Sequence, residues 1–144
     1  MRKILCVLLA TASLSFAGVP RGYKPVEKFE AAKAEAVEKK KLLAILVKGN
    51  NDSCPNCVTT VENANRAIKS SCMMLFMRVG EKTDLPAEIT DHFKGLPGGA
   101  SVSYFVFNPT TLELVAKGNR STLQSDKKAI RAFKNTVRKA KMAL

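Results

Sequence analysis

Two cysteines stand three positions apart where residues 52–57 read Asp-Ser-Cys-Pro-Asn-Cys, and thiols at this spacing can close a disulfide or attack one. The run before them, Leu42–Val47, is short, continuous and aliphatic, which is typical of a strand buried on both faces. The segment after them repeats apolar residues at helical spacing, at Cys57, Val61, Ala64 and Ile68. The pattern therefore predicts that Cys54 lies where a strand ends and a helix begins.

Pro55 suits the first turn of such a helix, where its missing N–H is no loss, so Cys54 is the expected N-cap. A sulfur at that position faces unpaired backbone N–H groups and the positive end of the helix dipole, and both favour thiolate over thiol. Cys57 follows within disulfide reach. A disulfide that closes so short a loop adds little stability through chain entropy, which favours redox chemistry over a structural bridge.

We expect the three thiols outside the N-terminal segment to differ. Cys54 should be exposed and acidic, whereas Cys57 and Cys72 should be shielded. Cys72 opens an apolar run, so we interpret it as a small core hydrophobe.

The first 17 residues have the pattern of a secretory signal peptide. Arg2-Lys3 is a positive start, Ile4–Leu14 is apolar, and Ser15-Phe16-Ala17 ends in a small-x-small cleavage signal. The apolar stretch is shorter than the roughly 20 residues that span a bilayer. We expect cleavage after residue 17, a single mature domain over residues 18–144, and an exported protein, periplasmic in a bacterium or otherwise secreted.

The chain is strongly basic, with 24 Lys+Arg against 12 Asp+Glu and a net charge of +12. Loss of Arg2 and Lys3 would leave 22 basic residues against the same 12 acidic ones. Such a surface is compatible with simple solvation, or with contact to an anionic membrane or to glycans. Export, and the lack of an RNP-like aromatic pattern or a helix-turn-helix signature, argue against nucleic acid as a partner.

Other residues that could do chemistry form no recognisable site. A zinc site would have to recruit Cys72 and His92, which lie at no familiar ligand spacing. His92 is interpreted as an exposed or capping residue without triad partners, and the cluster Met73, Met74 and Met77 as core. We therefore expect no metal and no cofactor.

The elements that must position the cysteines alternate along the chain. The patterns predict helices over 26–41, 55–69, 86–93 and 125–142, the last with Ser125 as N-cap, and strands over 42–47, 73–79, 102–107 and 112–117. A βαβ unit followed by a hairpin and a closing helix gives one central mixed sheet with helices on both faces. The expected fold is an α/β three-layer sandwich.

This order, with Cys54-Pro55-Asn56-Cys57 at the junction, resembles the thioredoxin-like superfamily over roughly residues 26–142. It looks most like exported thioredoxin-like domains with an extra N-terminal helix, which here carries Phe29-Glu30-Ala31-Ala32, Ala36 and Lys39–Lys41. The resemblance implies exchange of disulfides with protein thiols and a soluble or membrane-bound redox partner. Cys54 would be the attacking thiol and Cys57 the resolving one.

The chain departs from thioredoxins proper at three positions. Ser53 stands where they carry a Trp, and Lys48 stands where they bury an Asp that accepts the proton of the resolving thiol. Their cis-proline is matched by Pro97 through the local motif Gly95-Leu96-Pro97, whereas counting back from the end of the strand points to Val102. Lys48 either directs its ammonium at the sulfurs, which would stabilise thiolate, or extends into water.

The sequence therefore predicts an exported thiol–disulfide oxidoreductase whose potential is tuned by Pro55 and Asn56 between the cysteines. The alternative is a non-catalytic thioredoxin-like binding domain that keeps a structural or vestigial CxxC.

The expected signal peptide can be tested directly. When the full chain is produced in a bacterial host that exports it, the mature protein should begin near Gly18 because the cleavage signal ends at Ala17. Intact-mass analysis of the exported protein measures this. Retention of residues 1–17 in a membrane fraction would contradict the localisation.

Overall fold

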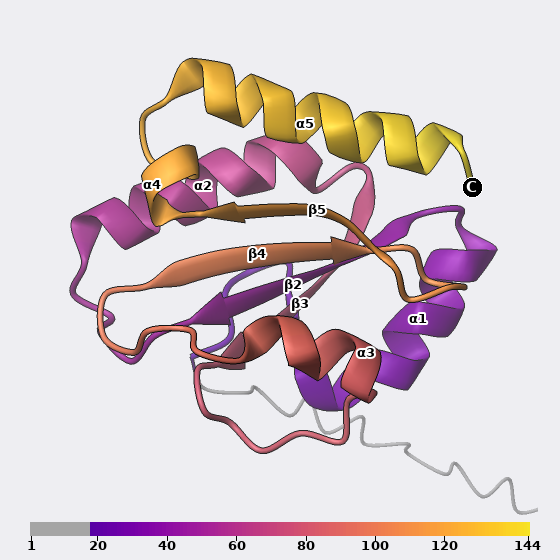
Figure 1. Ribbon diagram of the computed structural model, residues 1–144, viewed down its shortest axis with the longest axis horizontal. Helices are drawn as coiled ribbons and strands as arrows, with labels where there is room; N and C mark the ends of the chain where they lie inside the picture. The colour runs from indigo at the N-terminus through magenta and orange to yellow at the C-terminus, as the bar shows by residue number, and fades with distance from the viewer. Residues whose placement is uncertain (1–17) are drawn as a thin grey trace, which may run out of the picture.

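Residues 18–144, which the computed structural model describes, form one five-stranded sheet with helices on both faces (Figure 1). The expected signal peptide, residues 1–17, lies outside the described residues. None of the helices in the described part of the chain combines the length and the apolar character needed to cross a bilayer.

The elements follow one another from Lys24 to Met142. The strands are β1 (Lys24–Pro25), β2 (Leu42–Lys48), β3 (Cys72–Arg78), β4 (Val102–Phe107) and β5 (Leu114–Asn119). The α-helices are α1 (Phe29–Glu38), α2 (Pro55–Ile68), α3 (Ala87–Thr90), α4 (Arg120–Leu123) and α5 (Lys127–Met142), with the 3₁₀ turns η1 (Val26–Lys28) before α1 and η2 (Asp91–Phe93) after α3.

The strand β2 is the centre of the sheet, whose order is β1-β3-β2-β4-β5. It runs parallel to β3 and antiparallel to β4, and β5 pairs antiparallel with β4. Residues 42–47 are almost wholly buried, as expected for an aliphatic strand with neighbours on both edges and helices on both faces. At its end, Lys48 pairs with Arg78 on one side and Val102 on the other.

Two cores lie on opposite faces of the sheet, because successive residues of a strand point to opposite sides. Helices α2 and α5 cover one face, and α1 and α3 cover the other (Figure 1). The first core contains Cys54 and Cys57 together with Leu46, Ile68 and Tyr104. Burial of each large apolar side chain contributes about 1.5–3 kcal/mol to the stability of the fold, so side chains on both faces of the sheet stabilise it.

The expected α/β sandwich is confirmed, with differences at the ends of elements. The short elements β1 and α4 were not predicted, since two to four residues carry no periodic signal. The helix expected over 26–41 is regular only over Phe29–Glu38. Ser125 is not the cap of the last helix: Asp126 is, because its carboxylate accepts the N–H groups of Lys128 and Ala129 at 3.0 Å each.

The hairpin also differs from its prediction. Its return strand spans Leu114–Asn119 instead of residues 112–117. Leu112 has a positive φ of 60°, which places it in the turn that precedes the strand. The shift carries β5 two residues further, as far as the start of α4.

Gly49 joins β2 to the loop that carries the cysteines, and it lies against the segment before β4. Its N–H donates to the carbonyl of Ser101 at 2.9 Å, and the N–H of Asn51 donates to the carbonyl of Gly99 at 3.1 Å. A Cβ at Gly49 would collide with the Gly99 carbonyl. Glycine is required here because two backbones approach too closely for any side chain.

We expect Gly49→Ala to lower the free energy of unfolding by about 1–3 kcal/mol, since one of the two backbones must move. Urea unfolding measures the change. Gly98→Ala in the facing loop is the matched control, because a Cβ there meets no atom within 4 Å and its φ is not positive. Its stability should stay within about 0.5 kcal/mol of wild type, and equal losses in both variants would contradict the close-approach explanation.

Candidate active site

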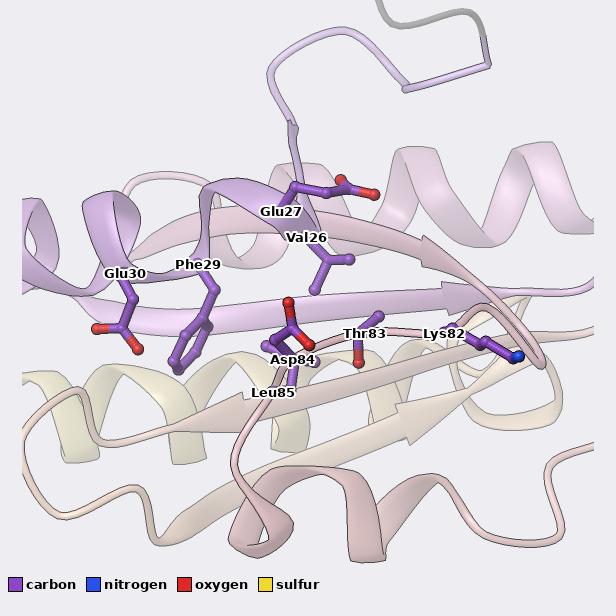
Figure 2. A pocket seen from close by; sticks show the side chains of 8 residues that line it. All are labelled: Val26, Glu27, Phe29, Glu30, Lys82, Thr83, Asp84 and Leu85. Atoms are coloured by element: carbon purple, nitrogen blue, oxygen red, sulfur yellow. The ribbon is translucent and has the colours of Figure 1, made fainter.

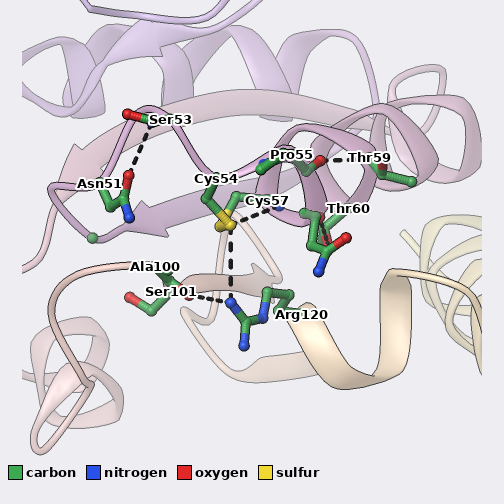
Figure 3. Close-up of a disulfide and its surroundings, with 12 residues drawn as sticks. Asn51, Ser53, Cys54, Pro55, Cys57, Thr59, Thr60, Ala100, Ser101 and Arg120 are labelled. Carbon is green, nitrogen blue, oxygen red and sulfur yellow. Dashed lines mark hydrogen bonds between the residues drawn. A yellow bond between two sulfur atoms is a disulfide. The ribbon is translucent and has the colours of Figure 1, made fainter.

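Cys54 is the N-cap of α2, as predicted from the strand-to-helix junction. Its backbone is extended (φ −78°, ψ 106°), and Pro55 occupies the first turn. The N–H of Cys57 donates to the Cys54 sulfur at 3.2 Å, so the sulfur takes the place of a capping oxygen. The two cysteines are joined by a disulfide, with their Cα atoms 5.2 Å apart (Figure 3).

Exposure differs among the three described cysteines. Cys54 retains 9% of its surface, against 3% for Cys72 and 1% for Cys57. In the disulfide form Cys54 is thus the most accessible of the three, although little of its surface is open, because its side chain turns back onto the first turn of α2 and belongs to the core beneath it.

Arg120 supplies a positive charge beside Cys54, and sequence analysis did not identify it. Its Nη1 lies 3.9 Å from the Cys54 sulfur and donates to the carbonyl of Ala100 at 2.8 Å (Figure 3). The two residues are 66 positions apart in the chain. They meet because β5 pairs with β4 and ends at Asn119, next to the start of β4. A cation at this distance favours a thiolate over a thiol.

The short helix α4 holds Arg120 in place. The Asn119 side chain accepts the N–H of Thr122 at 3.1 Å, and the Thr122 hydroxyl accepts the N–H of Asn119 at 3.0 Å, which makes a capping box. Gly118 allows α4 to fold back onto β5, because a Cβ there would lie 2.6 Å from the Leu123 side chain. The motif Gly118-Asn119 followed by a basic residue is the only local signal that could have pointed to this position.

Lys48 directs its ammonium to Asp52, at 2.8 Å from Oδ1, and this is its one ion pair in the described part of the chain. Lys48 thus ends in an exposed ion pair, an arrangement that neither expected alternative named; its own side chain is 14% exposed and that of Asp52 is 64% exposed. Arg78, from the neighbouring strand β3, binds both oxygens of the same carboxylate, at 2.8 and 3.1 Å. The bonds from Arg78 and then from Lys48 lower the pKa of Asp52 to about 2.

Comparisons with known proteins bear on the fold. No family model and no curated protein matches the sequence. Among solved structures, the crystal structure of a disulphide isomerase from Xylella fastidiosa Temecula1 is similar at a TM-score of 0.50 and 13% identity, over 90% of this chain and 98% of that one. The sheet order and the CxxC at the start of α2 agree with this likeness. The chain has a thioredoxin-like fold.

Within this thioredoxin-like fold, Pro97 does not have the role that its local motif suggested. The described residues contain no cis peptide bond. Pro97 lies in the loop before β4, where its carbonyl accepts the Ser101 hydroxyl, and residues 98–101 separate it from the strand. Motif matching failed because the loop is longer than the motif implies, and it is the carbonyl of Ala100 that accepts the hydrogen bond from Arg120 near the Cys54 sulfur.

Pro55 and Asn56 lie exposed between the cysteines on the first turn of α2. Their carbonyls accept the hydroxyls of Thr59 at 3.2 Å and Thr60 at 2.7 Å. These bonds tie the redox turn to the next turn of the helix. The side chains of Pro55 and Asn56 remain available to whatever docks at Cys54.

Cys72 lies in the core, as predicted. Burial raises the pKa of its thiol to about 12, and Lys41 and Lys141 offset this only in part. Cys72 is therefore a thiol at neutral pH and a poor nucleophile.

Tyr23 and Tyr104 lie in the same core, where their hydroxyls share a buried hydrogen bond of 2.6 Å. Burial raises the pKa of both tyrosines.

His92 is exposed, with its ring centroid 5.7 Å from that of Phe107 and 6.4 Å from that of Phe105. Over residues 18–144, no three side chains among His, Cys, Asp and Glu gather closely enough to hold a metal ion. The contacts of its ring with Phe105 and Phe107 show that His92 packs against β4 of the sheet.

A separate hollow lies beside η1 and the start of α1, where the loop after β3 passes (Figure 2). Its lining combines apolar side chains with charged ones: Val26, Glu27, Phe29, Glu30, Lys82, Thr83, Asp84 and Leu85. Val26, Phe29 and Leu85 belong to the core on the sheet face opposite the cysteines. With no cysteine or histidine in its lining, this hollow lacks a nucleophile for disulfide chemistry.

The Asp52 ion pairs predict that the stability of the loop between β2 and α2 falls in acid. Because the folded pKa of about 2 lies below the ordinary 3.8, this carboxylate stabilises the fold above about pH 4 and loses that contribution as the pH falls toward 2. Wild type should be more stable than Asp52→Asn at pH 6, and the difference should close at pH 2. Urea unfolding at several pH values measures it.

Asp84→Asn is the control for this experiment, since Asp84 makes no ion pair with the described residues. It should stay within about 0.5 kcal/mol of wild type at pH 6. Glu35, whose bonds to Lys24 and Lys39 also lower its pKa to about 2, contributes to acid loss in every variant and cancels in the comparison. A gap between wild type and Asp52→Asn that does not change with pH would contradict the assignment.

Proposed function

We propose that this chain is an exported thiol–disulfide oxidoreductase that exchanges disulfides with protein thiols through Cys54-Pro55-Asn56-Cys57. The observation that carries the proposal is the environment of one sulfur atom. The Cys54 sulfur caps a 14-residue helix, accepts the N–H of Cys57 at 3.2 Å and lies 3.9 Å from the Arg120 guanidinium. Helix dipole, N–H and cation all favour negative charge on that atom.

The reaction begins from the reduced pair. The Cys54 thiolate attacks one sulfur of a substrate disulfide, which forms a mixed disulfide and releases the other substrate sulfur as a thiolate. The Cys57 thiol then loses its proton and attacks the Cys54 sulfur, which breaks the mixed disulfide and releases the second substrate thiolate. The cysteine pair ends oxidised and the substrate reduced by two electrons, and the same steps in reverse oxidise a substrate dithiol.

The proton of Cys57 needs an acceptor, and the position that holds a buried acid in thioredoxins proper holds Lys48 here. The loop that carries the cysteines does contain one carboxylate, Asp52, but it forms ion pairs with Lys48 and Arg78. We infer that the first substrate thiolate to leave takes this proton, since it is a stronger base than water and is released at the site. Resolution by Cys57 then depends on the substrate's own leaving thiol.

The proposal includes a place and a partner. Export rests on the N-terminal segment, residues 1–17, and an oxidising compartment such as a bacterial periplasm suits an oxidised cysteine pair. A separate redox partner, soluble or membrane-bound, would return the pair to its working state. The basic outer face of α5 supports contact with anionic membranes or glycans, and its residues are Lys127, Lys128, Arg131, Lys134, Arg138 and Lys141.

A non-catalytic binding domain is the second candidate, and two observations favour it. Lys48 takes the place of the proton acceptor, and Ser53 takes the place of the Trp before the first cysteine. A redox titration separates the two candidates. A defined potential with fast exchange in glutathione buffers identifies an oxidoreductase, and a disulfide reducible only after unfolding identifies a structural bridge.

We expect the thiols of the reduced protein to react unequally. Cys54 should alkylate at pH 7 about tenfold faster than Cys57 or more, and faster still than Cys72, since only the thiolate reacts and burial holds the Cys72 pKa at about 12. Timed alkylation with peptide mapping ranks the three.

Turnover assays complete this test. Cys54→Ser and Cys57→Ser should each abolish catalysed reduction of a protein disulfide such as that of insulin. Cys72→Ala is the control and should keep turnover, because Cys72 lies in the core away from the exchange steps. Labelling of Cys72 as fast as Cys54, or turnover that survives loss of Cys54, would overturn the assignment.

A further inference from the structure

Within residues 18–144, Arg120 uses only one of its three guanidinium nitrogens. Nη1 makes the contacts to Ala100 and Cys54, whereas Nε and Nη2 make no hydrogen bond to any described residue. These two nitrogens still reach solvent, because no fully buried side-chain nitrogen among the described residues lacks a partner. In Figure 3 Nη1 points toward the Cys54 sulfur, and the edge formed by Nε and Nη2 lies on the far side of the guanidinium.

The charge of Arg120 is also uncompensated. No carboxylate in the described part of the chain forms an ion pair with it. Asp52, the carboxylate of the cysteine loop, already binds Lys48 and the two Nη atoms of Arg78. With the disulfide closed, the Cys54 sulfur is neutral as well. The site thus presents a positive charge that no described carboxylate balances.

We propose that Arg120 is a specificity-determining residue that selects substrates with a carboxylate next to the reacting cysteine. This inference rests on the proposed function and names its substrate class. Nε and Nη2 form the planar two-donor edge that matches the two oxygens of a carboxylate. A Glu adjacent to the substrate cysteine brings its carboxylate to that edge while the substrate sulfur lies on Cys54.

The geometry allows this contact to persist through the reaction. Ala100 holds Nη1 at 2.8 Å through a neutral carbonyl, so the guanidinium keeps its place whether the Cys54 sulfur is a thiolate, a mixed disulfide or the closed disulfide. When Cys54 attacks, one substrate S–S bond breaks, the mixed disulfide forms and the other substrate sulfur leaves as a thiolate. The substrate carboxylate takes no part in these bonds and remains paired with Arg120.

A pair of this kind at a half-buried position should favour the acidic substrate by about fivefold at low salt. The preference should shrink as the salt concentration rises, because ions screen the attraction. An uncharged isostere of the carboxylate would accept hydrogen bonds without the charge, so a Glu-to-Gln comparison in the substrate isolates the electrostatic part.

The test uses the Cys57→Ser variant, in which a mixed disulfide at Cys54 accumulates. Two disulfide-linked peptide dimers, identical except for Glu or Gln on each side of the cysteine, compete for the reduced protein, and intact mass measures the two adducts. We expect about a fivefold excess of the Glu adduct. Arg120→Gln in the same background should bring the ratio close to one, and Arg120→Lys should give an intermediate ratio because it keeps the charge without the two-donor edge.

Arg131→Gln is the matched control, since it removes an equal charge from the exposed face of α5. It should keep the full preference; an equal loss there would assign the effect to net charge and overturn the proposal. All adduct ratios are measured in the Cys57→Ser background. Dividing the ratio found with Arg120 present by the ratio found with Arg120→Gln cancels the intrinsic reactivity of the two peptides. Urea unfolding of each variant shows whether the Arg120 substitutions leave the fold intact.

The outcomes distinguish this inference from the proposed function. The adduct ratio needs a single exchange step, so it reports on Arg120 even in a protein without turnover. Wild-type turnover of both peptides with a ratio near one removes the inference and keeps the oxidoreductase. If neither peptide forms an adduct at Cys54, both the inference and the proposed function are wrong.

Discussion

The pairing of β2 with a strand on each side is the constraint on which the redox site depends. Lys48 pairs with Arg78 of β3 and Val102 of β4, so the chain leaves the sheet at a point fixed from both edges. Gly49 then passes directly against the segment before β4. Since both ends of the loop are anchored, α2 begins at one position, with the Cys54 sulfur over its first turn.

Two charge arrangements surround this junction, and they differ in balance. Asp52 is shared by Lys48 and Arg78, which closes one group of charges and ties the loop to the neighbouring strand. Among the described residues, Arg120 has only the Ala100 carbonyl and the Cys54 sulfur as partners. The carboxylate of the loop therefore stabilises the loop itself, and the charge of Arg120 remains unpaired 3.9 Å from the Cys54 sulfur. Because Asp52 is bound to Lys48 and Arg78, it does not neutralise Arg120.

The thioredoxin-like fold explains the position of the cysteines but not their behaviour, because a fold supports many sites. Here the features that thioredoxins use around the cysteines are replaced. Lys48 stands in for the buried acid and Ser53 for the Trp, and Pro97 lies in a loop, separated from β4 by residues 98–101. Arg120 enters from the end of β5. The proposed activity therefore rests on the helix cap and on Arg120, and it has to proceed without those features.

The sequence by itself determined the centre of the molecule. The aliphatic run of β2, Pro55 after Cys54 and the apolar spacing of α2 all act within a few residues, so local reasoning placed the strand, the helix and its sulfur cap correctly. Cys72 was likewise assigned to the core by its apolar neighbours. These features depend on propensities and periodicities that a linear sequence displays directly.

Only the tertiary structure decided which charges meet. Lys48 binds Asp52 because Arg78, from the adjacent strand, holds that carboxylate in reach. Arg120 reaches Cys54 across 66 residues because the β4–β5 register and the four-residue helix α4 carry it there, and neither leaves a periodic signal in the sequence. Pro97 misled because the length of a loop, not its motif, sets which residue faces the disulfide. Contacts of this kind are set by strand register and loop path, which side-chain patterns along one segment do not encode.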